Sequence, residues 1–368
     1  MRRAGRDHDR RDFVMRDVAI VATAQRPSQV HTELTSVELL FPVIGEVIER
    51  AGIERTDIGF WCHGSCDYMS GQPFSFVSAV DAIGAWPPIV ESHVEADGAF
   101  ALYEAWVKLQ TGECDTALVF SNGKTTAGPI DRILSLQMDP YTVAPLWPGL
   151  HAVSALQARA CLDTGVVTEA QMAAVAVRSR RDGASNPVAL AAGEATVEEL
   201  LARPYVTAPL REHDCAVVAD GANAVIIAAG DVARSLCERP AWIRGFDHRI
   251  DAQRLGARSL TASPSARLAA QHARVGDDKI DIAELHAPYT HQELLLVEAM
   301  GIDTERTRVN PSGGALLANP QMAAGLARFA EAADRVLDGS ADRVLAHCTS
   351  GPCLQQNLVC VMEGDRRG

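Results

Sequence analysis

The residues best suited to bind a ligand closely lie in the segment 309–320. Ser312, Gly313 and Gly314 combine a hydroxyl with two glycines, and apolar residues at helical spacing follow them. Glycines let the backbone of a tight loop approach a ligand, and the N–H groups at the start of a helix favour a negatively charged group. The segment is therefore a candidate binding loop. Asn319, near its end, supplies an amide that can donate a hydrogen bond.

Three further side chains have the chemistry of acids, bases or hydrogen-bond donors. His286 and Tyr289 directly follow an apolar run at 280–285, and Glu95 comes just before an apolar stretch at 99–110. An imidazole can stabilise the oxygen of an enolate, and a phenol or carboxylate can move a proton. The alternative for Glu95 is a carboxylate that caps a helix. The alternative for Tyr289 is a core aromatic whose hydroxyl is hydrogen-bonded.

The nine cysteines favour neither a disulfide framework nor a metal site. They are scattered from Cys62 to Cys360 in a chain of 368 residues, unlike the dense cysteines of small disulfide proteins. Cys62 and Cys66 are not spaced like a usual zinc-binding pair, and no second cluster follows them. Cys348 and Cys353 flank a Gly-Pro turn, so either could supply a nucleophilic thiol.

Length and composition predict a globular protein of the cytoplasm. With 368 residues and 47% hydrophobic content, the chain can form one large or two medium domains with substantial cores. No run approaches the roughly 20 apolar residues of a membrane helix, and no charged stretch followed by an apolar run suggests a signal peptide. The net charge of −13 argues against nucleic acid as a general partner.

The order of apolar segments predicts an α/β fold. Runs typical of buried strands alternate with segments of helical spacing, which favours a mostly parallel sheet covered on both faces. Expected strands lie at 18–22, 58–62, 116–121, 223–229, 280–285, 343–348 and 358–362, and expected helices at 36–51, 99–110, 268–275 and 292–300. A helix as apolar as 99–110 is expected to be buried between layers.

These segments divide the chain into a tail, two halves and an insertion. Residues 1–16 hold six arginines interleaved with aspartates and no apolar period, so we expect a disordered tail, with Met15 as an alternative start. The two halves are expected to span 17–232 and 238–368. The proline-punctuated stretch at about 122–210 is expected to be a loop domain inside the first half.

Two motifs and the order of elements resemble those of thiolases. Residues 310–314 read Asn-Pro-Ser-Gly-Gly, as in the thiolase loop that ends in Gly-His-Pro, but Asn319 stands here in place of that catalytic His. The nucleophilic Cys of thiolases begins the apolar helix, where this chain has Glu95. Residues 286–289 read His-Ala-Pro-Tyr where thiolases have Asn-Glu-Ala-Phe and sterol-carrier thiolases have His-Asp-Cys-Phe. The resemblance covers nearly the whole chain from Asp17.

The resemblance implies a thiolase fold. In that fold, two similar βαβαβαββ halves form a layered α-β-α-β-α sandwich with a loop-domain insertion. It further implies a coenzyme A thioester as substrate, no tightly bound cofactor and a homodimer. Acyl-CoA is expected under the loop domain, where Trp147 belongs to a lid at 140–148, and against Ser312, Gly313 and Gly314.

The replaced Cys and His argue against the usual acyl-enzyme, whereas groups that can stabilise an enolate are retained. The leading hypothesis is retro-aldol cleavage of a 3-hydroxyacyl-CoA, with Tyr289, Glu95, His286 and Asn319 as catalytic residues. This set resembles lipid-transfer-protein-type thiolase homologues. Some of those homologues are aldolases of steroid side-chain degradation that work with a small OB-fold partner.

Two other functions stay open. One is an acyltransferase of the acetyl-CoA acetyltransferase type that uses a displaced thiol such as Cys348 or Cys353. The other is a non-catalytic acyl-CoA-binding subunit whose partner performs the chemistry. An acyl-enzyme would favour the first, and turnover that is independent of Tyr289 and Glu95 would favour the second.

Overall fold

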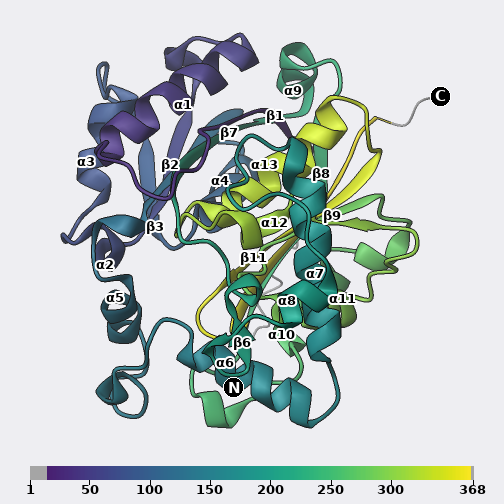
Figure 1. Ribbon diagram of the computed structural model, residues 1–368. Coiled ribbons are helices and arrows are strands. Elements are labelled where there is room, and N and C mark those ends of the chain that lie inside the picture. The colour runs from purple at the N-terminus through teal and green to yellow at the C-terminus, as the bar shows by residue number, and fades with distance from the viewer. Residues whose placement is uncertain (1–14, 366–368) are drawn as a thin grey trace, which may run out of the picture.

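The fold consists of two halves with the same order of elements, and an insertion in the first half (Figure 1). The structure is a computed structural model that describes residues 15–365. The first half contains β1 (Val18–Gln25), α1 (Ser36–Ala51), β2 (Phe60–Ser65), α2 (Asp67–Ser70), α3 (Phe76–Ile83), β3 (Glu91–Glu95), α4 (Gly98–Gln110), β4 (Thr116–Lys124), β7 (Asp220–Ala229) and α9 (Gly230–Leu236).

The insertion and the second half complete the chain. The insertion, between β4 and β7, contains α5 (Ile130–Leu136), α6 (Ala152–Asp163), α7 (Glu169–Asp182), α8 (Val197–Leu201), β5 (Tyr205–Thr207) and β6 (Leu210–Arg211). The second half contains β8 (Ala241–Ile250), α10 (Pro264–His272), β9 (Ile282–Leu285), α11 (Thr290–Met300), β10 (Arg308–Val309), α12 (Gly314–Leu317), α13 (Ala324–Leu337), β11 (Arg343–Ser350) and β12 (Gln356–Glu363).

The strand pairing repeats between the halves. Within the described residues, ten strands form one mixed sheet in the order β10-β9-β11-β12-β8-β1-β7-β4-β2-β3. β1 pairs antiparallel with β7 as β8 does with β12, and β4 pairs parallel with β2 as β11 does with β9. The halves join where β1 and β8 pair antiparallel. The sheet order confirms the predicted fold class of two similar βαβαβαββ halves.

Alternating side chains place helices on both faces of each half-sheet. In β1, Val18 and Ile20 belong to a central hydrophobic cluster, whereas Ala19 and Val21 belong to an outer one that includes α1 residues. In β12, Leu358 joins the central cluster, and the outward residues pack against a third cluster with α10 and α11. The resulting layers are α-β-α-β-α, with α4 and α13 in the middle.

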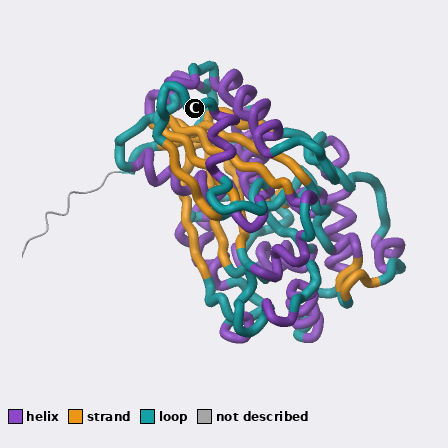
Figure 2. Tube along the Cα trace, turned by 90° about the vertical axis from the view of Figure 1, so that its left-hand side faces the viewer, coloured by secondary structure: helices purple, strands orange, loops and turns teal. Residues whose placement is uncertain are grey.

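The figures show this arrangement directly. In Figure 1, α1 and α3 lie on one side, α10 and α11 on the other, and α4 and α13 between them. Figure 2 shows the strands running together with helices around them, and a short two-stranded sheet apart from the main group. No helix among residues 15–365 is long and apolar enough to cross a membrane.

Local signals explain the helices that were predicted correctly. The helix expected at 36–51 is α1, which Thr35 begins with a capping box to Glu38 and Gly52 ends in the left-handed conformation. The apolar helix at 99–110 is α4, and its position between the two half-sheets explains why nearly all its faces are apolar.

Four expectations need correction. The sheet is mixed rather than mostly parallel, because five of its nine strand pairs among the described residues are antiparallel. The strand predicted at 58–62 runs from Phe60 to Ser65, because residues 55–57 form a short 3-10 turn first. The helix predicted at 268–275 is Pro264–His272, since Ser263 caps its start and Arg274 adopts a positive φ of 62° beyond its end. β3 was not predicted as a strand, because its sequence is mostly polar.

The structure describes only the last two residues of the predicted tail. Residues 1–14 of the predicted tail at 1–16 lie outside the described residues. Arg16, however, is held against α4 by hydrogen bonds. Its backbone N–H donates to Gln110 Oε1 at 2.8 Å, and its Nη1 donates to the Leu109 carbonyl at 2.9 Å.

The close approach of α4 to β2 yields a stability prediction. A Cβ built on Gly64 would lie 2.5 Å from Gly98 Cα and 2.6 Å from Gly98 N, both of them backbone atoms of the α4 start. Gly64→Ala should lower the free energy of unfolding by about 1–3 kcal/mol, because the backbone must move apart. Urea denaturation measures the change. Gly45→Ala in α1 is the control, with nothing within 4 Å of its Cβ, and should stabilise by about 0.5–1 kcal/mol. Equal effects would contradict the packing argument.

Candidate active site

A cavity of about 270 Å³ lies between the insertion and the second half. Its wall includes His151 from the insertion, Asp97 from the start of α4, and His286, Tyr289 and Asn319 from the second half. These residues are far apart in the chain, and the layered fold brings them to one place. Three of the four predicted catalytic residues therefore share one cavity, and the fourth, the carboxylate at position 95, does not line it.

His286 and Asn319 form a polar pair on the cavity wall. His286 follows β9, and its backbone N–H donates to the His347 carbonyl at 3.1 Å, which extends the β9–β11 ladder by one residue. Its ring Nε2 lies 3.2 Å from Asn319 Oδ1. Burial lowers the pKa of His286, so the imidazole is neutral near pH 7. Asn319 is held by its own N–H, which donates to the Val217 carbonyl at 2.9 Å.

Tyr289 and His151 form a second pair. Tyr289 Oη lies 3.1 Å from His151 Nδ1 and 3.4 Å from the Leu150 carbonyl. Burial raises the pKa of Tyr289. Burial also lowers the pKa of His151. The phenol therefore stays protonated and donates, and the neutral imidazole can accept its proton.

Asp97 links the cavity to the two central helices. The carboxylate is 3% exposed and caps its own helix, where Oδ1 accepts from the Ala99 N–H at 2.9 Å. It also caps α13 from outside that helix. Oδ2 accepts from the Gly325 N–H at 2.8 Å and Oδ1 from the Leu326 N–H at 2.9 Å. The negative charge thus meets two helix N-termini.

Glu95 lies at the end of β3 with its side chain 49% exposed, and it is not among the residues that line the cavity. Its Oε1 accepts from the Asp67 N–H at 2.8 Å, at the start of α2. Its Oε2 lies 3.9 Å from His93 Nε2. Glu95 thus serves as a cap for a short neighbouring helix, whereas Asp97, two residues later, occupies the start of α4.

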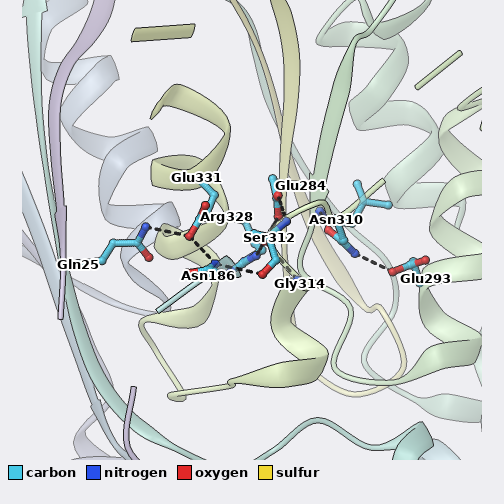
Figure 3. A network of polar contacts seen from close by, with 10 residues as sticks. Gln25, Asn186, Glu284, Glu293, Asn310, Ser312, Gly314, Arg328 and Glu331 are labelled. Atoms are coloured by element: carbon cyan, nitrogen blue, oxygen red, sulfur yellow. Dashed lines mark hydrogen bonds and ion pairs between the residues drawn. The ribbon is translucent and has the colours of Figure 1, made fainter. Parts of the chain in front are cut away.

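Ser312, Gly313 and Gly314 are buried in a polar network rather than on the cavity wall (Figure 3). Ser312 Oγ donates to Glu284 Oε2 at 2.6 Å, and its N–H donates to Oε1 at 3.0 Å. Arg328 Nη1 completes the group, 2.8 Å from Glu284 Oε2. A Cβ on Gly313, which has a φ of 93°, would collide with a leucine side chain. The loop is therefore packed behind the cavity wall, and its predicted part in binding stays a prediction.

Trp147 lies at the edge of the cavity. It is 57% exposed and lines a hollow with Arg132 and Pro148, and Pro148 also belongs to the cavity wall. Its φ of 45° is left-handed, which is uncommon for a bulky residue. The predicted lid residue thus lies in a hollow beside the cavity and does not line the cavity itself.

The two cysteines proposed as displaced thiols differ in access. Cys353 lines the cavity at a φ of 54°, and burial raises its pKa to about 12. Cys348 is 0% exposed and lies behind His286, with Sγ 3.5 Å from the ring Nδ1. Burial, followed by the charge of Asp97, raises the pKa of Cys348. Both thiols are therefore protonated near neutral pH.

Asp97, His286 and Cys348 offer the metal-binding atoms that come closest together among the described residues, within 4.8 Å of one another. The carboxylate oxygens already accept three backbone N–H groups, and the thiol is protonated. A metal ion would have to compete with both, so the donor set fits a metal poorly.

Sequence reasoning missed Asp97 and His151. An acidic residue directly before the apolar helix was a detectable cap signal for Asp97, but the resemblance drew the assignment to Glu95. His151 lies in the insertion, where no motif marked it. Only its distance to Tyr289 in the folded chain identifies it.

The sheet and the layers define a thiolase fold, as comparison with solved structures shows. The Ltp2-ChsH2(DUF35) aldolase matches with a TM-score of 0.79 at 20% identity, covering 96% of this chain and 100% of that one. The acetyl-CoA acetyltransferase of Bacillus anthracis matches with a TM-score of 0.77 at 14% identity, covering 96% of this chain and 100% of that one. Human mitochondrial 3-ketoacyl-CoA thiolase matches with a TM-score of 0.74 at 15% identity, covering 95% of this chain and 99% of that one.

Sequence relatives agree with the fold. The chain is 26% identical to the acetyl-CoA acetyltransferase of Methanothermobacter thermautotrophicus, over 86% of this chain and 90% of that protein. It is 27% identical to the benzoylsuccinyl-CoA thiolase subunit BbsB of Thauera aromatica, over 87% and 92%. No protein-family model matches. These relatives confirm the predicted resemblance to the thiolase superfamily.

The double cap at Asp97 leads to a second prediction. Asp97→Ala removes a charged acceptor from three backbone N–H groups and should lower the free energy of unfolding by about 2–4 kcal/mol. Asp97→Asn keeps one amide oxygen and should lose less. Thermal and urea unfolding measure both variants. Asp231→Ala, on the exposed first turn of α9, is the matched control and should change little. A similar loss at both positions would refute the special role of Asp97.

Proposed function

We propose that the chain is an acyl-CoA-acting C–C lyase that cleaves a 3-hydroxyacyl-CoA by a retro-aldol reaction. The observation that carries the proposal is the pairing in one cavity of hydrogen-bond donors, His286 and Asn319, with a proton-transfer pair, Tyr289 and His151. A lyase of this type needs these two functions and no nucleophile.

The donor pair suits the thioester oxygen. With Nε2 of His286 directed at Asn319 Oδ1, the Asn319 Nδ2 has no protein partner among residues 15–365 and lies at the cavity wall. A thioester carbonyl placed there accepts a hydrogen bond that strengthens as the oxygen gains enolate charge. His286 and Asn319 are therefore assigned to enolate stabilisation.

The second pair suits the proton of the substrate hydroxyl. Tyr289 Oη takes this proton while its own proton passes to His151 Nδ1, 3.1 Å away. The C2–C3 bond breaks, its electron pair becomes the thioester enolate, and C3 becomes a carbonyl. The same proton returns through Tyr289 to C2 of the enolate. The products are a ketone or aldehyde and a shortened acyl-CoA, with no net gain or loss of protons.

Substrate class and partners are part of the proposal. A coenzyme A thioester with a branched or steroid-derived acyl chain is supported by the hollow near Trp147 and by the partly apolar wall of the cavity.

A homodimer is supported by β3, which pairs only with β2 among the described strands, and by exposed apolar residues beside it, Tyr68, Phe74, Val77, Trp86 and Val90. An OB-fold partner is supported by the exposed Tyr141, 90% accessible on the insertion.

The direct test follows product formation. The chain, alone and with any OB-fold protein encoded beside it, is incubated with a tertiary 3-hydroxyacyl-CoA, and products are followed by mass spectrometry. We expect a ketone and a shortened acyl-CoA. Tyr289→Phe and His151→Gln should each lower kcat by about 10²–10⁴-fold, because the proton route is lost. Tyr205→Phe, outside the cavity, is the matched control and should keep full activity.

One result would count against the lyase, and another against its proposed proton route. Bound but intact substrate in every mixture would favour the non-catalytic subunit. Full turnover by Tyr289→Phe would leave the reaction in place but remove the proposed proton route.

Acyl transfer is the second candidate, because two sequence relatives are named an acetyltransferase and a thiolase subunit and because Cys353 lines the cavity. For the lyase, we expect no acyl adduct on the protein after a single turnover with acyl-CoA, since the thiol is protonated and buried. Intact-protein and peptide mass spectrometry measure this. An adduct on Cys353 that is absent from Cys353→Ser would establish the acyltransferase instead.

A further inference from the structure

Cys348 cannot touch a substrate, yet it lies beside a residue that can. Its side chain is fully buried, and it does not line the cavity. Its Sγ lies 3.5 Å from His286 Nδ1. Gly325 packs so closely against this thiol and Asp97 that any Cβ there would overlap both. The position of the thiol is therefore fixed by packing.

The direction of the hydrogen bond between the thiol and His286 depends on which ring nitrogen carries the proton. Asp97 carries negative charge on one side, and burial and this charge both raise the pKa of Cys348, so its hydrogen is retained. His347, the preceding residue, is engaged elsewhere, with Nε2 2.9 Å from Asn357 Oδ1. Three acceptors lie within reach of the S–H: His286 Nδ1 and the Thr349 carbonyl, each 3.5 Å from Sγ, and the Asp97 carboxylate. Because Asn319 Oδ1 faces Nε2 of His286, Nε2 is the ring atom that carries the proton, and Nδ1 is left as an acceptor. The S–H can donate to Nδ1, which leaves the ring proton on Nε2.

We propose that Cys348 is a positioning residue that holds His286 in the Nε2–H tautomer and thereby turns the Asn319 amide so that Nδ2 faces the cavity. The chain of donors then runs from Cys348 S–H to His286 Nδ1, from His286 Nε2–H to Asn319 Oδ1, and from Asn319 Nδ2–H to the ligand. The assignment of the ligand as a thioester rests on the proposed function. The tautomer and the amide orientation do not.

Loss of the thiol would reverse the direction of these hydrogen bonds. Without a donor at Nδ1, the ring proton can move to Nδ1, and Nε2 becomes an acceptor. The Asn319 amide then satisfies Nε2 with its NH₂ group and presents Oδ1 to the cavity. An oxygen facing a developing enolate oxygen repels it, so the stabilisation is lost although no residue of the cavity wall has changed.

The first experiment reads the tautomer without substrate. Two-bond ¹H–¹⁵N spectra of protein labelled at histidine distinguish Nε2–H from Nδ1–H, and His286→Gln assigns the His286 signals. We expect Nε2–H in the wild type and in Cys348→Ser, whose hydroxyl can replace the S–H donor. In Cys348→Ala we expect a shift to Nδ1–H or to a mixture.

Cys360→Ala is the matched control. Cys360 lies on β12, its buried thiol faces the same central cluster, and no histidine contacts it. The same atoms are deleted from the same layer, so stability should fall by a similar amount, but the His286 tautomer should not change.

Steady-state kinetics supply the second test of the proposal. Cys348→Ala should lower kcat about 10- to 100-fold with KM changed by less than about threefold, because the donor acts mainly on the transition state. Cys348→Ser should restore most of the rate. A purely structural role would make Cys348→Ala and Cys360→Ala equivalent in both spectra and rate, and this result would overturn the proposal.

The two hypotheses fail in different ways. An Nδ1–H tautomer in the wild type, or an unchanged tautomer in Cys348→Ala, overturns the role of Cys348 even if turnover is observed. The expected tautomers in a protein without lyase activity uphold that role and refute the proposed function. A stoichiometric metal bound by Asp97, His286 and Cys348 in the purified protein would also overturn the donor chain.

Discussion

The structure depends on one buried carboxylate that holds two helix ends together. Asp97 caps α4 through the Ala99 N–H and α13 through the Gly325 and Leu326 N–H groups. These helices form the central layer, so the interaction fixes how the two halves sit against each other. Unpaired N–H groups and an unpaired charge are both costly inside a protein, and the contact removes both costs at once. Because Asp97 also lines the cavity, the same contact sets the floor of the site.

The cavity exists because the two halves and the insertion meet next to Asp97. The strands end at a common edge, where the residue after β9 and the segment after α12 bring His286 and Asn319 together. The insertion adds His151 opposite Tyr289. Behind the wall, the Asn-Pro-Ser-Gly-Gly segment is held by a buried ion pair of Glu284 and Arg328. The motif that looks like a binding loop in the sequence is thus packed behind the cavity wall in the fold.

Burial decides the chemistry of the groups more than their types do. Tyr289 and Cys348 have pKa values raised by burial, and those of His286 and His151 are lowered. Tyr289, His286 and His151 on the cavity wall are therefore neutral near pH 7, next to the carboxylate of Asp97, and neutral groups of this kind suit the proposed relay of a proton. A thiolate nucleophile fits this environment poorly, because burial raises the pKa of Cys348 and of Cys353, and the charge of Arg258 offsets this only in part at Cys353.

The sequence by itself determined the fold class. It also singled out four candidate catalytic residues, of which three, His286, Tyr289 and Asn319, line the cavity. Alternating apolar periods report local burial, and motifs such as those at His286 and Asn319 are contiguous, so both can be read along the chain. Tertiary structure decided the rest. Glu95 and Asp97 are only two residues apart in the sequence. Glu95 ends the strand and is exposed at the surface, whereas Asp97 starts the following helix and is buried between two helices. Ser312 and the glycines face inward, and His151 reaches Tyr289 across 138 residues, because packing of distant segments sets which side chains share a space.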